Sequence, residues 1–277
     1  MPNFDTSDGL TLHYSVEGNP QGVPVLCLSG LTRNTSDFSY VTPHLADVRL
    51  IKLDYRGRGL SDWAEDYLSY NVPRECRDVL DLMDHLGIER FAVLGTSRGG
   101  LNAMTLGAMV KERLLGVAFN DIGPVLETEG LEVILGYLGR NPGWKNYREA
   151  TAARPGVMAG FANVSAARWR EEVEKFYHQT PDGLIINYDP RLRDAVIEAG
   201  THDAPDLWPY YEALADLPVA VIRGGNSDLL SEETFGEMGR RIPNAILATV
   251  PDRGHIPFLD EPEAVAALRE WVDRLKA

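Results

Sequence analysis

Short apolar runs alternate with helix-spaced apolar stripes through most of the chain. Several runs are apolar at nearly every position, which is typical of strands covered on both faces of a parallel sheet. The predicted strands are Val23–Leu28, Val48–Leu53, Phe91–Leu94, Leu114–Phe119, Val219–Arg223 and Ala245–Val250. The predicted helices are Ser36–Ala46, Pro73–Leu86, the residues after Gly99, Ser231–Arg241 and a C-terminal helix that starts at Glu261. This alternation predicts an α/β fold with a mostly parallel sheet and helices on both faces.

Two parts of the chain depart from this rhythm. Residues 5–18 alternate apolar and polar positions around Ser7-Asp8-Gly9, which predicts an antiparallel hairpin. After Pro124 the pattern becomes helical, with few strands and with turns such as Pro181-Asp182-Gly183. We therefore divide the chain into a core of residues 1–123 and 216–277 and a helical insertion of residues 124–215. Such an insertion cannot extend the sheet, so we expect it to lie across the carboxyl edge as a lid.

The most informative motif is the G-x-S-x-G sequence of residues 95–99. It lies between a predicted buried strand and a predicted helix, which is the context of a nucleophile elbow. A turn this sharp strains the backbone at Ser97 and lifts its hydroxyl clear of the sheet. Gly95 and Gly99 leave room where side chains would collide with neighbouring backbone. Ser97 is therefore a candidate nucleophile.

A serine hydroxyl needs a base to remove its proton and an acceptor to hold that base in one tautomer. Open α/β sheets place such groups at the carboxyl ends of their strands. In chain order, Ser97, Asp228 and His255 all follow predicted strands. Asp121 also follows a strand and stays open as the alternative acid. We take Asp228 as the first choice.

Composition narrows the classes of partner. The 277 residues carry a net charge of −14, which argues against nucleic acid and anionic membranes as partners. We see no signal peptide and no apolar run long enough to cross a bilayer. The two cysteines, Cys27 and Cys76, lie in apolar surroundings and suggest reduced thiols, so we expect a cytoplasmic protein. We expect a small-molecule substrate and a monomer or homodimer.

No pattern in the sequence favours a cofactor or a metal. There is no H-E-x-x-H sequence, cysteine cluster or Walker loop. Gly57 and Gly59 begin a possible dinucleotide fingerprint, but Asp62 occupies the position of its third glycine. We therefore expect neither a cofactor nor a bound metal ion.

Several motifs together resemble the α/β-hydrolase fold superfamily over essentially the whole chain. They are Gly95-Thr96-Ser97-Arg98-Gly99-Gly100, Asp54-Tyr55-Arg56-Gly57-Arg58-Gly59-Leu60-Ser61, Gly224-Gly225-Asn226-Ser227-Asp228, and Gly254-His255-Ile256-Pro257 with Glu261-Pro262. The resemblance implies an eight-stranded core and a helical cap inserted after the sixth strand. It implies that Ser97 is the nucleophile, His255 the general base and Asp228 the orienting acid.

The resemblance also implies an oxyanion hole made by the backbone N–H groups of Leu31 and Arg98. The family usually has His-Gly before the first of these donors, whereas this chain has Ser29-Gly30. Backbone donation does not need the histidine side chain, so we expect the hole to be kept. Arg33 and Trp208 are candidate substrate contacts.

We predict a serine esterase or lactonase that forms an acyl-enzyme. The same three groups could hydrolyse a carbon–carbon bond in a ring-cleavage product, and the fold could instead serve as a non-catalytic ligand receptor. Dehalogenases and epoxide hydrolases of this fold use an aspartate nucleophile, so Ser97 excludes them.

Overall fold

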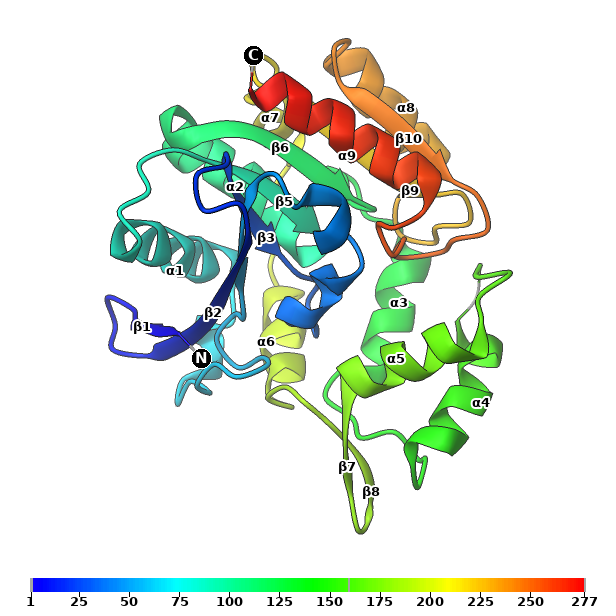
Figure 1. Ribbon diagram of the computed structural model, residues 1–277. Helices are drawn as coiled ribbons and strands as arrows, with labels where there is room; N and C mark the ends of the chain where they lie inside the picture. The colour runs from blue at the N-terminus through cyan, green and yellow to red at the C-terminus, as the bar shows by residue number, and fades with distance from the viewer. Residues whose placement is uncertain (1, 159, 277) are drawn as a thin grey trace.

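The computed structural model describes residues 2–158 and 160–276, and these residues contain an eight-stranded sheet (Figure 1). The strand order is β1-β2-β4-β3-β5-β6-β9-β10. The strands are β1 (Asn3–Asp5), β2 (Thr11–Gly18), β3 (Pro24–Leu28), β4 (Arg49–Leu53), β5 (Phe91–Thr96), β6 (Leu114–Asn120), β9 (Val219–Gly224) and β10 (Ile246–Val250). β2 is antiparallel to β1 and β4, and the other neighbours are parallel. The predicted eight-stranded, mostly parallel sheet is confirmed.

Helices cover both faces of this sheet. One face carries α1 (Val72–His85), α2 (Arg98–Val110), α7 (Trp208–Glu212) and α8 (Glu232–Arg241). The other carries α9 (Pro262–Leu275) and the short 3₁₀ helices η1 (Thr35–Ser39) and η2 (Thr42–Leu45). Two further 3₁₀ turns are η3 (Tyr67–Ser69) and η4 (Lys111–Arg113). The helix predicted over residues 36–46, bent or started partway by Pro43, is instead these two 3₁₀ helices, and Pro43 lies in the first turn of the second. Proline has no backbone N–H, and its ring clashes with a preceding helical turn, so it breaks the segment there.

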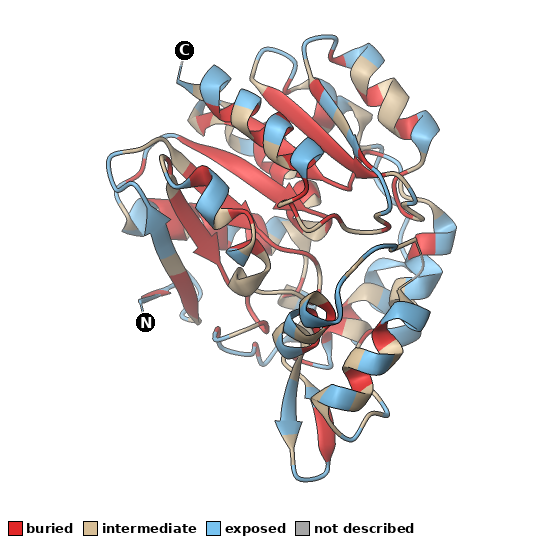
Figure 2. Cartoon of the chain, turned by 45° about the vertical axis from the view of Figure 1, so that its right-hand side comes forward, coloured by how far each residue is buried: buried red, intermediate tan, exposed pale blue. Residues whose placement is uncertain are grey.

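Apolar side chains on these helices explain why they pack where they do. On α1, Cys76, Val79 and Met83 recur at helical spacing and are fully buried against the sheet. On α9, Leu268 and Val272 form the corresponding buried stripe on the opposite face. Every residue of β5 is buried, and the sheet strands are the most continuously buried part of the chain (Figure 2).

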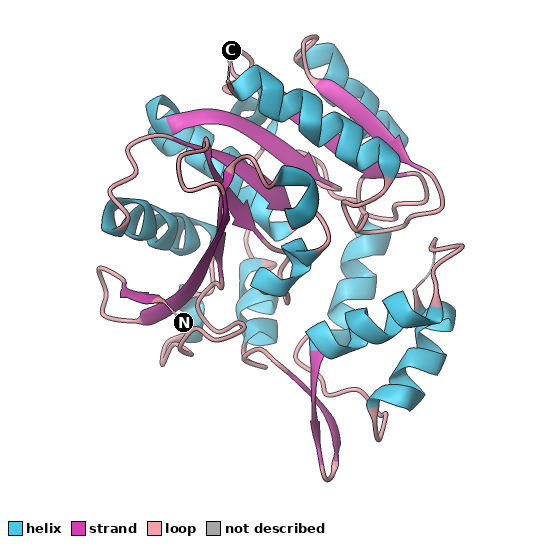
Figure 3. Ribbon diagram, in the orientation of Figure 1, coloured by secondary structure: helices cyan, strands magenta, loops and turns pink. Residues whose placement is uncertain are grey.

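Residues 124–215 are inserted between β6 and β9 (Figure 3). This inserted segment contains α3 (Thr128–Tyr137), α4 (Tyr147–Val157), α5 (Ala166–Phe176), β7 (Tyr177–Thr180), β8 (Gly183–Ile186), α6 (Leu192–Ala199) and α7. The expectation of mainly helical structure agrees with these elements. The β7–β8 hairpin was not predicted, although the turn at residues 181–183 that joins its strands was. At the end of the segment, Tyr211 of α7 packs against Phe119 of β6.

Within residues 2–158 and 160–276, no helix combines the length and the apolar character that a bilayer crossing requires. The two cysteines, Cys27 and Cys76, are both buried and unpaired. Burial raises the pKa of the Cys27 thiol to about 12, so it stays protonated and packs as a small apolar side chain.

Candidate active site

Ser97 stands on the turn that joins β5 to α2, and its backbone has a positive φ of 49°. This is a strained conformation for a residue that carries a side chain. The neighbouring glycines make the turn possible. A Cβ on Gly99 would lie 2.0 Å from the Leu28 carbonyl oxygen, and one on Gly95 would lie 2.5 Å from the Gly99 carbonyl oxygen. The sequence therefore folds here as an elbow that presents the Ser97 hydroxyl.

The structure brings the Ser97 hydroxyl and the His255 imidazole together from distant parts of the chain. His255 Nε2 lies 3.0 Å from Ser97 Oγ, within hydrogen-bond distance. The other ring nitrogen, Nδ1, lies 2.7 Å from the Asp121 carboxylate. Because an ionised carboxylate can only accept, this contact places the imidazole proton on Nδ1 and leaves Nε2 free to accept from Ser97.

The carboxylate beside His255 therefore belongs to Asp121, and the preference for Asp228 was wrong. Asp121 directly follows β6, is fully buried and has a positive φ of 55°. Its carboxylate accepts hydrogen bonds from the Gly224 N–H at 2.7 Å and from the Ser227 hydroxyl at 2.6 Å. Among the described residues, Asp228 makes no hydrogen bond to His255. The loop after β9 thus supplies donors that hold the acid, and the acid comes from the adjacent strand.

The loop that carries His255 is braced on two sides. The Glu261 carboxylate accepts from the backbone N–H of Leu259 at 2.9 Å and pairs with Arg253 at 2.7 Å. The inserted segment contacts the same loop. The Ala162 N–H donates to the Asp252 carbonyl at 3.1 Å, and Arg253 donates to the Ala162 carbonyl at 3.0 Å. These contacts fix the position of the imidazole.

The two backbone N–H groups expected at an oxyanion hole belong to Leu31, on a loop, and to Arg98, at the start of α2. Leu31 belongs to the loop after β3, in which Gly30 lies so close that a Cβ would be 3.8 Å from Ser97 Cβ. Arg98 is the first residue of α2, so its N–H has no partner within the helix. Among the described residues neither N–H has a hydrogen-bond acceptor.

The Arg98 side chain does not point at Ser97. Its Nε donates to the Glu75 carboxylate at 2.8 Å. Arg58 approaches the same carboxylate at 2.9 Å, and both Arg58 and Glu75 are fully buried. Burial alone would raise the pKa of Glu75, but the two arginines lower it. This buried cluster fixes the start of α2 beneath the elbow.

Arg33 and Trp208, the candidate substrate contacts, have other partners. The Arg33 guanidinium pairs with Asp37 at 2.6 Å and with Glu172 of α5 at 2.8 Å. It therefore joins the loop after β3 to the inserted segment. Trp208 packs against Tyr211, and Arg241 stacks on its ring at 4.1 Å. Neither of those neighbours belongs to the Ser97 site.

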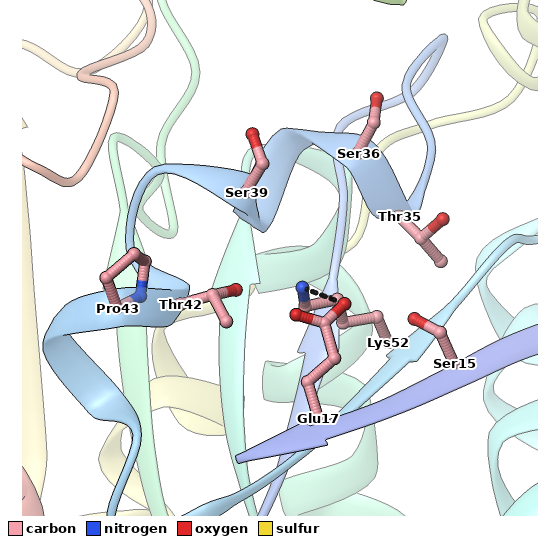
Figure 4. A pocket seen from close by; sticks show the side chains of 8 residues that line it. All are labelled: Ser15, Glu17, Thr35, Ser36, Ser39, Thr42, Pro43 and Lys52. Carbon is pink, nitrogen blue, oxygen red and sulfur yellow. Dashed lines mark hydrogen bonds and ion pairs between the residues drawn. The ribbon is translucent and has the colours of Figure 1, made fainter.

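A surface hollow lies elsewhere, between η1, η2 and the edge of the sheet (Figure 4). It is lined by Ser15, Glu17, Thr35, Ser36, Ser39, Thr42, Pro43 and Lys52. Its one buried cation, Lys52, pairs with Glu17 at 2.8 Å. Ser97 and His255 do not line this hollow, and its charges are already matched.

The Ser97, His255 and Asp121 groups can activate a hydroxyl for attack on a carbonyl carbon. No group of three or more His, Cys, Asp or Glu side chains in the described part of the chain is arranged to hold a metal ion.

Comparisons with known proteins agree with this geometry. The model of the alpha/beta hydrolase family matches residues 25–268. A 3-hydroxybutyrate-oligomer hydrolase from Cupriavidus necator is 36% identical over 263 residues, which cover 91% of this chain and 89% of that protein. The 3-oxoadipate enol-lactonase 1 of Acinetobacter baylyi is 26% identical over 262 residues, 92% of this chain and 90% of that protein.

A solved structure extends the comparison to three dimensions. An alpha/beta hydrolase from Novosphingobium aromaticivorans DSM 12444 superposes with a TM-score of 0.91 and 36% sequence identity, covering 99% of this chain and 97% of the other. The sheet order, the family match and these relatives all agree. The chain belongs to the alpha/beta hydrolase family and is a hydrolytic enzyme.

Proposed function

We propose that the protein is a serine hydrolase that cleaves a small carboxylic ester or a lactone through an acyl-enzyme. One observation carries this proposal. A continuous hydrogen-bonded chain runs from Ser97 Oγ through the His255 imidazole to the buried Asp121 carboxylate. It supplies a nucleophile, a base in the required tautomer and an acid that stabilises the imidazolium.

In the proposed reaction, His255 Nε2 takes the proton as Ser97 Oγ attacks the carbonyl carbon. The N–H groups of Leu31 and Arg98 donate to the oxygen that becomes negative. The tetrahedral intermediate collapses, and His255 returns the proton to the leaving alcohol. A water molecule then attacks the acyl-enzyme, with His255 again as base, and releases the acid and free Ser97.

The inserted segment acts in this proposal as a cap over the site. Two ion pairs support this role because they join the segment to loops of the core. Arg33 pairs with Glu172, and Arg168 pairs with Asp260, five residues after His255. Trp169 packs against Phe258 of the same loop.

The names of two relatives support an ester or a lactone as the bond that is cleaved. One is a hydrolase of 3-hydroxybutyrate oligomers and one is an enol-lactonase. Hydroxy-acid units in an oligomer are joined by esters, and a lactone is an internal ester. Both groups suit an acyl-enzyme formed on Ser97.

Covalent labelling tests the proposal directly. A neutral fluorophosphonate should label Ser97 of the wild-type enzyme, and Ser97→Ala should abolish labelling. The same substitution should lower kcat on a short ester by about 10⁵–10⁶-fold. An unlabelled wild-type protein, or a variant that keeps a tenth of the turnover, would contradict the proposal. A vinylogous β-diketone assayed in parallel would reveal carbon–carbon bond hydrolysis instead.

A further inference from the structure

Arg154, on α4 of the inserted segment, is a buried arginine without a counter-charge. Only 7% of its surface is exposed. No carboxylate of the described residues lies within ion-pair distance of its guanidinium, and its buried Nε has no hydrogen-bond partner there. Burial lowers the pKa of Arg154. Its Nε is removed from water, and no anion of the described residues takes the place of that water.

The other buried arginines show how unusual this is. Arg56 and Arg58 each have a carboxylate partner that is itself in the core or beside it, and each contact offsets the cost of removing the charge from water. Arg223 has no carboxylate partner among the described residues, but its guanidinium donates to two backbone carbonyls, at 2.8 Å and 3.3 Å. Arg154 has neither kind of partner there, so an anion from outside the described residues would complete its surroundings.

The surroundings of Arg154 place it near the proposed oxyanion loop. Its guanidinium carbon lies 4.5 Å from the centre of the Phe176 ring. The guanidinium carbon of Arg33 lies 3.7 Å from the centre of the same ring. Arg33 is two residues after Leu31, the proposed oxyanion donor. The Phe176 ring therefore places Arg154 beside the loop at which the scissile carbonyl would bind.

The charges of this region leave one positive charge over. The cations are Arg33, Lys175 and Arg154, and the anions that pair with the first two are Asp37 and Glu172. The two Glu172 oxygens already bind Arg33 at 2.8 Å and Lys175 at 3.1 Å. Neither is left for Arg154. A single excess charge fits a monoanion such as a carboxylate better than a doubly charged phosphate.

We propose that Arg154 binds a free carboxylate carried by the substrate, so that the enzyme prefers esters or lactones of acidic molecules. This inference rests on the proposed hydrolase function and adds the class of substrate. The planar guanidinium can donate two parallel hydrogen bonds to a carboxylate, and that geometry would orient the substrate beside Ser97.

Two matched substrate pairs test this inference. In the first, a para-nitrophenyl monoester of adipic acid carries the carboxylate on the acyl side. In the second, the acetate ester of β-hydroxybutyric acid carries it on the alcohol side. The neutral partner of each is the corresponding primary amide, which keeps the size and removes the charge.

Arg154→Gln should lower kcat/KM for at least one carboxylate substrate by about 100-fold and change its amide partner by less than about 3-fold. Arg154→Lys should keep part of the kcat/KM for the carboxylate substrate, because lysine carries the positive charge but not the two parallel N–H donors of a guanidinium. The matched control is Arg170→Gln on α5, whose guanidinium is exposed and paired with Glu174. Arg170→Gln should leave the ratio of kcat/KM between each carboxylate substrate and its amide unchanged. Equal losses for acid and amide in both pairs would overturn the inference and leave the Ser97 chemistry untouched.

A binding experiment separates this inference from the proposed function. In a Ser97→Ala background no turnover is needed, and adipic acid monoamide can be titrated calorimetrically against its diamide. The monoamide should bind, the diamide should not, and Arg154→Gln should abolish binding. Absence of binding, or equal binding after Arg154→Gln, would refute the role of Arg154. Failure of Ser97 labelling would refute the hydrolase proposal alone.

Discussion

The sheet core and the inserted segment are held together in different ways. In the core, buried apolar side chains form two large continuous clusters, one on each face of the sheet. Buried residues of the segment form two small clusters. One, around Leu138 and Leu192, also includes Ala64 and Tyr70 of the core, and the other lies around Val173 and Leu184. Exposed surface dominates the segment, whereas the central strands of the sheet are buried (Figure 2).

Buried arginines differ between the two regions in a similar way. Arg56 and Arg58 of the core each have a buried carboxylate partner, and Arg223 of the core donates to two backbone carbonyls. Arg154 of the segment has neither kind of partner in the described structure. The core therefore has the rigidity that a serine, an imidazole and a carboxylate need to stay in register. The segment has smaller buried clusters to stabilise it. It also carries the groups that we propose recognise the substrate.

The sharpest test of the core compares its two candidate acids. Asp121→Asn should lower kcat by about 10⁴-fold, because the imidazole loses both its tautomer control and its counter-charge. Asp228→Asn should change kcat by less than about 10-fold, since Asp228 does not contact His255. Steady-state kinetics on one ester measure both. A larger loss from Asp228→Asn would mean that the acid lies on the loop after β9.

A second test compares two buried glutamates that each bridge two cations. Glu75→Gln should lower the free energy of unfolding by about 3–5 kcal/mol, because Arg58 and Arg98 would be left unmatched in the core. Glu172→Gln should cost less, since Arg33 keeps Asp37. Urea denaturation gives both values. Limited proteolysis should show that Glu172→Gln exposes mainly residues 124–215. Equal decreases in the free energy of unfolding for the two variants would contradict the proposed difference between core and segment.

A third and smaller effect is expected from pH. Burial alone would raise the pKa of Glu172, but Arg33 and Lys175 lower it to about 2 from its usual 4.5. Because the folded pKa lies below the unfolded one, this group contributes stability above about pH 4.5 and loses it as the pH falls toward 2. Amide exchange in α5 should therefore accelerate over that range before exchange in β5.

Glu172→Gln is the control for that titration. It removes the ionisable group, so the excess acid sensitivity of α5 should shrink. An unchanged difference between α5 and β5 would show that other carboxylates cause it.

Local pattern and turn chemistry were enough to predict the strands of the large sheet, the elbow and the pairing of Ser97 with His255, but not the β7–β8 hairpin. Which aspartate contacts His255 could be decided only from the three-dimensional structure. β6 and β9 are adjacent parallel strands, so Asp121 and Asp228 follow neighbouring strand ends and the sequence cannot rank them. The partners of Arg33 were equally hidden, because Glu172 is far away along the chain. Nothing in the sequence pointed to Arg154, because only the folded structure shows whether a buried arginine has a carboxylate partner.

The hydrogen bonds between Ala162 and the loop at Asp252 and Arg253 have a mechanical consequence. They tether that part of the segment to the loop of His255, so a swing of the segment at this point would drag the imidazole with it. Substrate entry that leaves the base undisturbed should instead separate the segment from the loop at Arg33, where Glu172 pairs with it. Both partners of that ion pair are more buried than Arg168 and Asp260, so added salt should weaken it less than the pair beside the His255 loop.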